Sequence, residues 1–324
     1  MNTKEQFEKL FNNQLSTESA KELLIELYNR GETYEDIATV AKIMREHSIK
    51  LPISKELQDR AIDIVGTGGD KSGSFNISTT VSLLLASLGS VVAKHGNRSI
   101  TSNSGSADVL EALGINLNLT PKQQVKMLEE IGFCFIFAMN HHPAMKHIMP
   151  IRKSIEHRTI FNILGPLTNP AGAKKYLLGV FSPNYIERMA KALIELKATR
   201  AFVVSSNDGM DEISLATTTP FAYIEGGIVS QGVIDPQEFG FELAPKEAIL
   251  GGSATDNAKI TRDIFANKAN RAKQDIVILN AGFALFADGK ARDIKEAFEI
   301  ARDGIESGKA QKHLELISQV SNRF

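Results

Sequence analysis

The apolar positions in residues 1–60 recur at the spacing of amphipathic helices. Three leucines between positions 23 and 27 fall at helical spacing, and Gly31 is a natural stop for that helix. Thr33 and Asp36 form a capping-box pattern, with Asp in place of the usual Glu, ahead of a second apolar series. Pro52 ends the region. The pattern predicts a small all-helical domain over residues 1–60.

Short apolar runs typical of buried strands alternate with helical segments from residue 61 onward. Strands are expected at residues 61–65, 91–93, 133–139, 176–181, 201–204 and 275–279. This alternation predicts a larger α/β domain, residues 61–324, with a mostly parallel central sheet covered by helices on both faces. The stretch 221–233 alternates and contains Gly226-Gly227, which predicts a small antiparallel hairpin.

The charge balance and the cysteine count narrow the class of protein. Lys and Arg total 37 against 38 Asp and Glu, so the net charge of −1 gives no basic surplus for nucleic acid or an anionic membrane surface. One cysteine excludes an internal disulfide framework and a multi-cysteine zinc site. Residues 1–15 lack the apolar segment of a secretory signal, and the run 81–93 is too short and too polar to span a bilayer. A cytoplasmic enzyme or binding protein is therefore expected, with no nucleic-acid or membrane partner.

A glycine loop follows the first expected strand directly. The loop reads Gly66-Thr67-Gly68-Gly69-Asp70, and three glycines in four positions allow positive φ and let backbone N–H groups converge on an anion. A plain glycine-rich turn is the alternative. The loop is neither a P-loop, since no Gly-Lys-Ser/Thr follows, nor a dinucleotide fingerprint, since the spacing of the third glycine fails.

Small polar residues then gather at the start of the next helix and at the end of the second strand. Residues 74–79 read Ser-Phe-Asn-Ile-Ser-Thr, and ordinary helix capping explains only one of the four polar side chains. A helix N-terminus with spare hydroxyls is a ready phosphate site. The second strand ends in Lys94-His95-Gly96-Asn97-Arg98-Ser99, and residues 102–106 add further small polar groups. Two successive anion-binding loops on neighbouring strands favour a ligand with two separated phosphate groups.

Asp211-Glu212 follows a third strand end of the same kind. Adjacent carboxylates commonly form a solvated turn. On a rim that carries phosphate loops, however, they match the way Mg²⁺ is held, by one or two carboxylates together with substrate phosphates.

Three other features are weighed against ordinary structural roles. The chain has one cysteine and no further carboxylate near the pair His141-His142, which disfavours a metal site there, and Cys134 lies in an apolar run typical of a core position. Arg152 and Arg158 flank a helical stretch, where each could hold a carboxylate through two hydrogen bonds or lie on the surface.

Taken together, these segments resemble the anthranilate phosphoribosyltransferase family. The resemblance covers nearly the whole chain, and its longest motif, residues 158–170, reads RTIFNILGPLTNP. The other segments that carry the resemblance are residues 63–70, 94–98, 104–114, 142–145 and 209–212.

The resemblance implies a nucleoside phosphorylase/phosphoribosyltransferase-like fold. In this fold a helical domain is joined by hinges to a larger α/β domain, and segments near residues 155–180 return to the helical domain. Members of the family transfer the phosphoribosyl group of 5-phosphoribosyl 1-diphosphate (PRPP) to the amine of anthranilate, releasing pyrophosphate, in tryptophan biosynthesis. The resemblance also implies Mg²⁺ as cofactor, a homodimer formed through the helical domains, and a possible glutamine amidotransferase partner.

The resemblance assigns residues to each ligand. The PRPP contacts are Gly66, Gly69, Asp70, Ser74, Asn76, Ile77, Ser78, Thr79, Lys94, His95, Gly96, Asn97, Arg98, Ser99, Ser102 and Ser106. The anthranilate contacts are Gly66, Asn97, His142, Arg152 and Pro166. The metal ligands are Ser78, Asp211 and Glu212. No firm general acid or base is assigned.

The chain departs from the family pattern in two places, and two other functions stay open. Glu156 stands where the family often has glycine, and Val204-Ser205-Ser206 stands where it often has Val-His-Gly, so the shapes of these loops are open. A pyrimidine nucleoside phosphorylase would share the fold and a related glycine loop but has less need for Asp211-Glu212. A non-catalytic relative that binds nucleic acid would be expected to carry a basic surplus.

Overall fold

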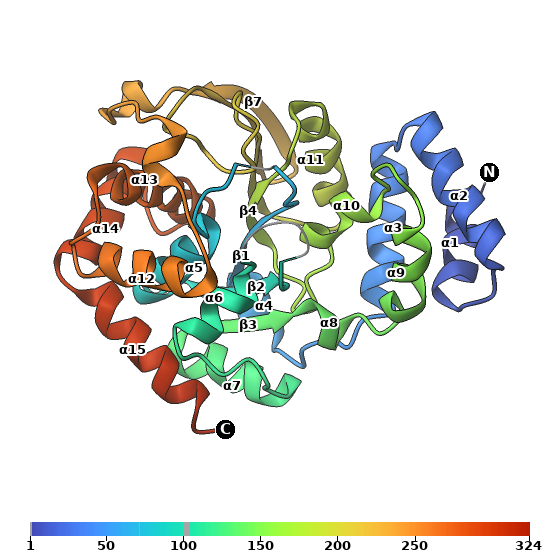
Figure 1. Ribbon diagram of the computed structural model, residues 1–324, viewed down its shortest axis with the longest axis horizontal. Helices are drawn as coiled ribbons and strands as arrows, with labels where there is room; N and C mark the ends of the chain where they lie inside the picture. The colour runs from blue at the N-terminus through green and yellow to red at the C-terminus, as the bar shows by residue number, and fades with distance from the viewer. Residues whose placement is uncertain (1, 71, 100–103) are drawn as a thin grey trace.

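The computed structural model describes residues 2–70, 72–99 and 104–324, and these residues build one central sheet flanked by helices (Figure 1). The strand order is β3-β2-β1-β4-β5-β6-β7. The first five strands in chain order pair in parallel, and β6 and β7 join as an antiparallel edge. The mostly parallel sheet and the hairpin are therefore confirmed. The strands are β1 Ala61–Gly66, β2 Val91–Gly96, β3 Phe133–Phe137, β4 Lys175–Gly179, β5 Arg200–Val204, β6 Thr219–Glu225 and β7 Ile228–Ile234.

Helices cover both faces of this sheet. Helices α5 and α13 pack against its strands and against each other, and α11 packs against β5 and β6 from the other side (Figure 1). Within the described residues, none of the helices combines the length and the hydropathy that crossing a bilayer requires. The helices are α1 Thr3–Phe11, α2 Thr17–Arg30, α3 Tyr34–Glu46, α4 Lys55–Arg60, α5 Ile77–Ser87, α6 Ser106–Ala112, α7 Pro121–Ile131, α8 Ala138–His141, α9 Met145–Lys153, α10 Phe161–Leu164, α11 Ile186–Glu195, α12 Ala254–Phe265, α13 Arg271–Asp288, α14 Ile294–Glu306 and α15 Lys309–Ser321.

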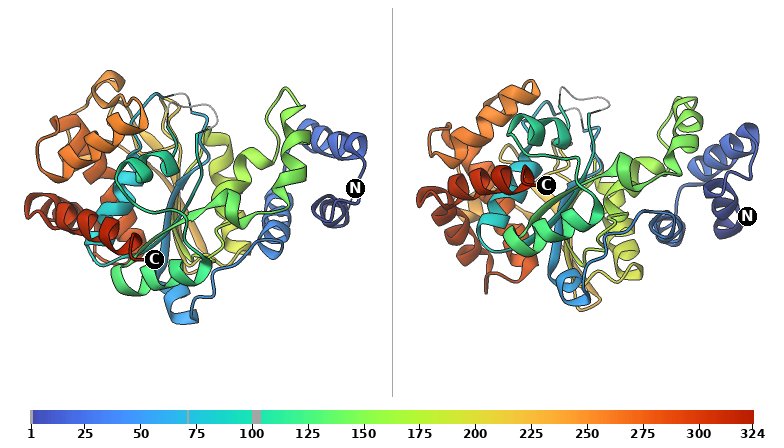
Figure 2. Two further views of the ribbon diagram at one scale, coloured as in Figure 1. Left: turned by 60° about the horizontal axis from the view of Figure 1, so that its bottom comes forward. Right: turned by 90° about the horizontal axis from the view of Figure 1, so that it is seen from below.

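The N-terminal helices stand beside the sheet rather than on it. Figures 1 and 2 show α1, α2 and α3 at one end of the molecule, with α9 alongside them. Helix α9 contacts α2, and α10 contacts α3, so chain from the middle of the sequence returns to the N-terminal helices. The resemblance places the returning segments near residues 155–180. The returning chain also includes α9, which begins earlier, at Met145.

The expected strand at residues 275–279 is wrong, because these residues lie inside α13. Asn270 caps the start of α13 through a hydrogen bond from the backbone N–H of Lys273, and Gly289 ends it in the left-handed conformation. Helix α13 is buried almost all round, so residues 275–279 show no polar face. A short apolar run without a polar face cannot be told from a buried strand by its pattern alone.

The predicted capping box of α3 is confirmed and also joins three helices. Thr33 and Asp36 bond reciprocally to each other's backbone N–H groups. The Asp36 carboxylate accepts further bonds from the Thr3 hydroxyl of α1 (2.7 Å) and from the Arg30 guanidinium of α2 (2.8 Å). Burial alone would raise the pKa of Asp36, but these hydrogen bonds and the Arg30 charge outweigh it and hold the pKa below its ordinary value.

Replacing this carboxylate should therefore loosen the N-terminal helices. We expect Asp36→Ala to lower the free energy of unfolding by about 1–2 kcal/mol at pH 7, measured by urea denaturation. A lowered folded-state pKa stabilises only above the unfolded pKa of about 3.9, so the difference from the wild type should shrink as the pH falls below about 4. The control is Asp256→Ala, in the exposed capping box of α12, where the hydrogen bonds of Asp256 among the described residues go to Ser253 of the same cap. An equal loss from both variants would contradict the joining role of Asp36.

Candidate active site

Two paired glycines end the β1–β4 ladder and let another loop cross it. Gly66 of β1 lies opposite Gly179 of β4, at the point where the strand order reverses and where open α/β sheets bind ligands. A Cβ on Gly179 would lie 1.4 Å from the backbone oxygen of Asp211, and one on Gly66 would lie 2.2 Å from Asp211 Oδ2. Both strands must therefore end in glycine for Asp211 to lie across them.

Three carboxylates meet at this crossing. Asp211 Oδ2 accepts a 2.7 Å hydrogen bond from the Gly68 N–H of the glycine loop. Carboxylate oxygens of Asp70, Asp211 and Glu212 all lie within 4.8 Å of one another. Burial raises the pKa of Asp211 and of Glu212, and the charge of Asp70 raises both further, while the hydrogen bond with Glu212 lowers the pKa of Asp211. The sequence pointed to Asp211 and Glu212 as metal ligands, and the structure adds Asp70 to them.

This cluster has the chemistry of a divalent-cation site. Asp70 Oδ2 is buried and has no hydrogen-bond partner within the described part of the chain. Carboxylate oxygens are the ligands that Mg²⁺ prefers, and a cation would offset the repulsion among these three carboxylates. Ser78, the third predicted ligand, lines the same small cavity as Asp211 and Glu212.

The N-terminus of α5 lies beside the glycine loop with no side chain capping it. Asn76 occupies the N-cap position, but its side chain makes no capping bond. Its amide donates to the Ser104 carbonyl, and its Oδ1 accepts from Ser104 Oγ and from Asn257 of α12. The side chains of Ile77 and Thr79 are buried, and the Ile77 N–H already donates 2.7 Å to the Phe75 carbonyl, so the N–H groups of Ser78 and Thr79 are the ones that this turn can offer to a ligand. The first turn of α5 thus keeps N–H groups available for an anion.

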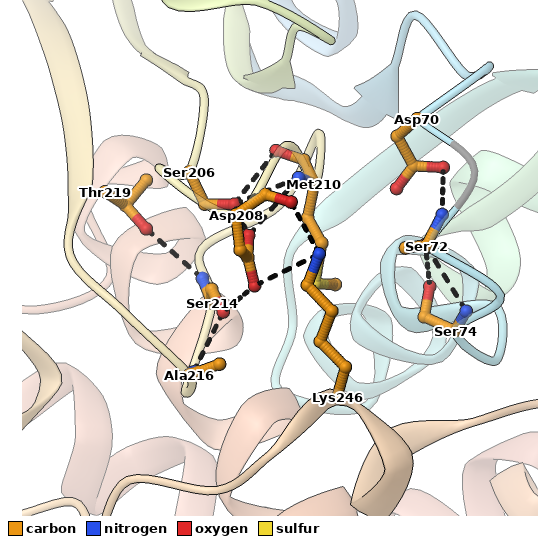
Figure 3. Close-up of polar contacts among 10 residues, drawn as sticks. All are labelled: Asp70, Ser72, Ser74, Ser206, Asp208, Met210, Ser214, Ala216, Thr219 and Lys246. Carbon is orange, nitrogen blue, oxygen red and sulfur yellow. Dashed lines mark hydrogen bonds and ion pairs between the residues drawn. The ribbon is translucent and has the colours of Figure 1, made fainter.

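The chain between the glycine loop and α5 is held by its serines. Ser72 N–H donates to Asp70 Oδ1 (3.3 Å), and the Ser72 and Ser74 hydroxyls lie 3.0 Å apart (Figure 3). Ser74 also forms an isolated β-bridge with Leu250. These contacts tie Asp70 to the entry of α5.

The residues predicted to contact PRPP at the end of β2 and in the loop after it include both buried and accessible side chains. Lys94 is buried, and its ammonium donates 2.8 Å to the Ile64 carbonyl of β1. Burial lowers the pKa of Lys94 to about 8. A Cβ on Gly96 would lie 2.3 Å from Ser106 Oγ, which itself donates to the Asn97 carbonyl. Glycine at 96 therefore lets the start of α6 approach the end of β2.

Arg98 is exposed and already paired. Its guanidinium bonds to Asp108 (2.8 Å) and to both carboxylate oxygens of Glu111 (2.6 and 2.7 Å) on α6. Ser99 N–H donates to Asp108 as well. Ser102, also predicted to contact PRPP, lies outside the described residues.

Two neutral histidines form a short relay beside Pro166. Burial lowers the pKa of His95 well below its ordinary value and that of His142 to about 4. His95 Nδ1 lies 3.2 Å from the Gly165 carbonyl, which can only accept, so Nδ1 carries the proton. His95 Nε2 must then accept from His142 Nε2, 3.3 Å away. This leaves His142 Nδ1 as a buried acceptor with no partner in the described ranges.

The two predicted arginines differ in their surroundings. Arg152, at the end of α9, is half-buried, and its closest polar contact is Met149 Sδ at 3.8 Å. No carboxylate pairs with it in the described residues, and burial lowers its pKa. Arg158 instead donates to the Gly69 carbonyl (2.8 Å) and stacks 3.5 Å from the centre of the Phe181 ring.

A network around Asp208 shapes the loop that carries Asp211 and Glu212 (Figure 3). The Asp208 carboxylate accepts from the hydroxyls of Ser206 and Ser214 and from Met210 N–H. Lys246 donates 2.5 Å to the Asp208 carbonyl. Sequence reasoning missed Asp208 and Lys246. Asp208 precedes Asp211 by three residues and could have been found there, but nothing in the sequence marks Lys246.

The chain is similar to known proteins over nearly its full length. Residues 58–311 match the family described as "Glycosyl transferase family, a/b domain". The anthranilate phosphoribosyltransferase of Rubrobacter xylanophilus is 44% identical over 309 residues, which is 95% of this chain and 89% of that protein. That of Persephonella marina is 43% identical over 318 residues, covering 98% and 93%.

Solved structures agree with these relatives. Anthranilate phosphoribosyltransferase from Thermus thermophilus superposes with a TM-score of 0.92 at 41% identity, covering 99% of this chain and 94% of that one. The enzyme from Saccharomyces cerevisiae in complex with PRPP and Mg has a TM-score of 0.88 at 26% identity, covering 98% and 91%.

A side chain at position 66 should disable the carboxylate cluster. Gly66→Ala must displace the Asp211 carboxylate, so we expect the affinity for Mn²⁺, measured by calorimetry, to fall about tenfold or more. The control is Gly308→Ala, a left-handed glycine at the start of α15 with no atom within 4 Å of its Cβ position. The control should lose stability and keep its Mn²⁺ affinity. Unchanged Mn²⁺ binding in Gly66→Ala would mean that Asp211 does not hold the cation.

Proposed function

Because the chain belongs to the anthranilate phosphoribosyltransferase family, we propose that it transfers the phosphoribosyl group of PRPP to the amine of anthranilate, in tryptophan biosynthesis. The products are N-(5-phosphoribosyl)anthranilate and pyrophosphate. The observation that carries the proposal is the carboxylate cluster of Asp70, Asp211 and Glu212 beside the uncapped N-terminus of α5. A cation site next to an anion site suits a diphosphate that binds together with Mg²⁺.

The donor substrate would be held mainly by backbone groups. The glycine loop and the first turn of α5 offer N–H groups, and Ser74 and Ser78 add hydroxyls. The loop after β2 and Ser106 would hold the other phosphate end of PRPP. Asp211, Glu212 and Ser78, joined by Asp70, would hold Mg²⁺. When bound, Mg²⁺ would supply positive charge to the departing pyrophosphate.

The chemistry then requires positioning more than proton transfer. The bond between the ribose anomeric carbon and the pyrophosphate oxygen breaks, and its electron pair leaves with pyrophosphate. The anthranilate amine, neutral at pH 7, donates its lone pair to the anomeric carbon, and its nitrogen then loses a proton. Fixed N–H groups around the leaving group stabilise the charge that builds there.

The acceptor substrate would lie toward the histidine relay. Arg152 is a half-buried cation without an acidic partner in the described residues, which suits the anthranilate carboxylate. His142 Nδ1 is an acceptor for an amine N–H. Asn97, Pro166 and Gly66 complete the proposed anthranilate contacts.

Loss of anthranilate fluorescence on mixing the protein with PRPP and Mg²⁺ tests the proposal directly. No loss at any protein concentration would overturn it. A pyrimidine nucleoside phosphorylase is disfavoured by the three clustered carboxylates, and a nucleic-acid-binding role by the net charge of −1. The homodimer, the amidotransferase partner, the cytoplasmic location and the boundary between the two domains stay predictions.

Removing the charge of the cluster should abolish turnover. We expect Asp211→Asn with Glu212→Gln to lower the rate at least a hundredfold at saturating PRPP, because Mg²⁺ loses two ligands. The matched control is Glu129→Gln with Glu130→Gln, an adjacent acidic pair exposed on α7 that undergoes the same change of charge. Wild-type activity of the Asp211/Glu212 variant at limiting Mg²⁺ would refute the metal role.

Arg152 should separate the two substrates. A charge-assisted hydrogen bond contributes about 1.5–3 kcal/mol, so Arg152→Ala should raise the KM for anthranilate about ten- to a hundredfold. The KM for PRPP should change much less. Lys153→Ala, the exposed neighbouring cation, is the control and should leave both constants unchanged. An equal rise in both constants for Arg152→Ala would show that Arg152 does not recognise anthranilate specifically.

A further inference from the structure

Strands β1 and β2 pair only at their amino ends. Their ladder joins Ala61 to Val91 and Ile62 to Val92 and then stops. Each strand nevertheless continues to its carboxyl end along its other neighbour. β1 stays paired with β4 as far as Gly66, and β2 stays paired with β3 as far as Gly96. The sheet is therefore parted between the two strands whose following loops are proposed to hold PRPP.

Side chains replace the missing ladder bonds in this gap. Asp63 of β1 accepts from the His95 N–H of β2 through Oδ1 (3.2 Å), and Lys94 of β2 donates to the Ile64 carbonyl of β1 (2.8 Å). Asn169 is inserted between them. Its amide donates 2.8 Å to Asp63 Oδ2 and 2.8 Å to the Ala93 carbonyl.

Asn169 is itself firmly held from the opposite side. Its Oδ1 accepts from Ala171 N–H (2.9 Å), which fixes the orientation of the amide. The segment around it is tied to the N-terminal helices, since Arg45 of α3 donates to the Leu167 carbonyl and Leu51 N–H donates to the Pro170 carbonyl. The Asn169 side chain is therefore held in a fixed position between β1 and β2 by residues that lie outside the sheet.

We propose that Asn169 is a positioning residue for the transfer reaction: its amide holds the carboxyl ends of β1 and β2 apart and so sets the spacing between the two loops that bind PRPP. The inference rests on the proposed function. Asn169 is 1% exposed and Asp63 fully buried, and the polar atoms of both side chains are bonded to protein groups, so we assign neither a ligand contact. Burying such polar groups is costly, and apolar residues with a continued ladder would satisfy the same backbone groups. What the buried Asn169 amide provides instead is the separation between the carboxyl ends of β1 and β2.

The test removes the donor while keeping the shape. Asn169→Asp keeps the acceptor for Ala171 N–H but cannot donate to Asp63 or Ala93. We expect its Kd for PRPP with Mg²⁺, measured by calorimetry, and its KM for PRPP to rise about tenfold or more. Its KM for anthranilate should rise less than its KM for PRPP, because the proposed anthranilate contacts Arg152 and His142 lie outside the gap and only Gly66 and Asn97 adjoin it.

A role in stability alone would give a different result. Partial unfolding would reduce the active fraction and the apparent kcat while leaving both KM values unchanged. Asn116→Asp is the matched control, since the Asn116 amide donates to a backbone carbonyl, that of Ser321, away from the sheet. The control should lower the unfolding temperature without changing PRPP affinity.

Exchanging the partners should rescue binding in part. The double variant Asp63→Asn with Asn169→Asp restores one hydrogen bond across the gap with donor and acceptor reversed, although the Ala93 carbonyl stays without its donor. We expect it to bind PRPP more tightly than Asn169→Asp alone. Additive losses in the double variant would overturn the inference. If Asn169→Asp does not fold, Asn169→Ser carries the same measurement, because its shorter side chain has a single O–H donor and cannot bond to Asp63 and to the Ala93 carbonyl together.

The outcomes separate the two proposals. If the wild type binds no PRPP, the proposed function fails. If the wild type binds PRPP and a folded Asn169 variant binds it equally well, only the positioning role of Asn169 fails.

Discussion

The candidate site depends on the close contact between Asp211 and the paired glycines of β1 and β4. Any side chain at Gly66 or Gly179 would occupy the space of Asp211, because their Cβ positions lie 2.2 and 1.4 Å from its atoms. This contact brings a loop from beyond β5 across the reversal of strand order, where Gly68 N–H can bond to its carboxylate. Glu212 and Asp70 then complete a cluster that two distant chain segments must build together.

The surrounding hydrogen bonds must hold the three carboxylates together although their negative charges repel one another. Burial and the charge of Asp70 raise the pKa values of Asp211 and Glu212, so the surrounding loops must be rigid or the cluster would separate. The departure from the family pattern at Ser206 contributes here, because its hydroxyl bonds to Asp208 and to Met210 N–H. The other departure, Glu156, lies exposed on the surface. Loop shape at residues 205–212 is thus set by hydrogen bonds around Asp208 (Figure 3).

Buried polar side chains gather toward the carboxyl ends of β1 and β2. Asp63, Lys94, His95 and Asn169 are all less than 5% exposed, whereas the remaining sheet positions of β1 and β2 are apolar apart from their terminal glycines. These polar groups, whose burial is unfavourable in free energy, lie beside the loops proposed to bind PRPP. Each is satisfied by a named partner, so the network is compatible with a stable core.

The sequence alone determined the fold class, the hairpin, the glycine loop and the pair Asp211-Glu212, because periodicity and short motifs are local. It failed at residues 275–279, where a helix buried all round has no polar face to reveal its period. It also missed the approach of Asp70 to Asp211 and Glu212, the hydrogen bonds of Asn169 between β1 and β2, and the hydrogen bond from Lys246 to Asp208. These depend on contacts between residues up to 143 positions apart, as in the Gly68–Asp211 bond. Only the tertiary structure decides such contacts, since a residue's own neighbours in the chain do not specify which distant backbone group it will meet.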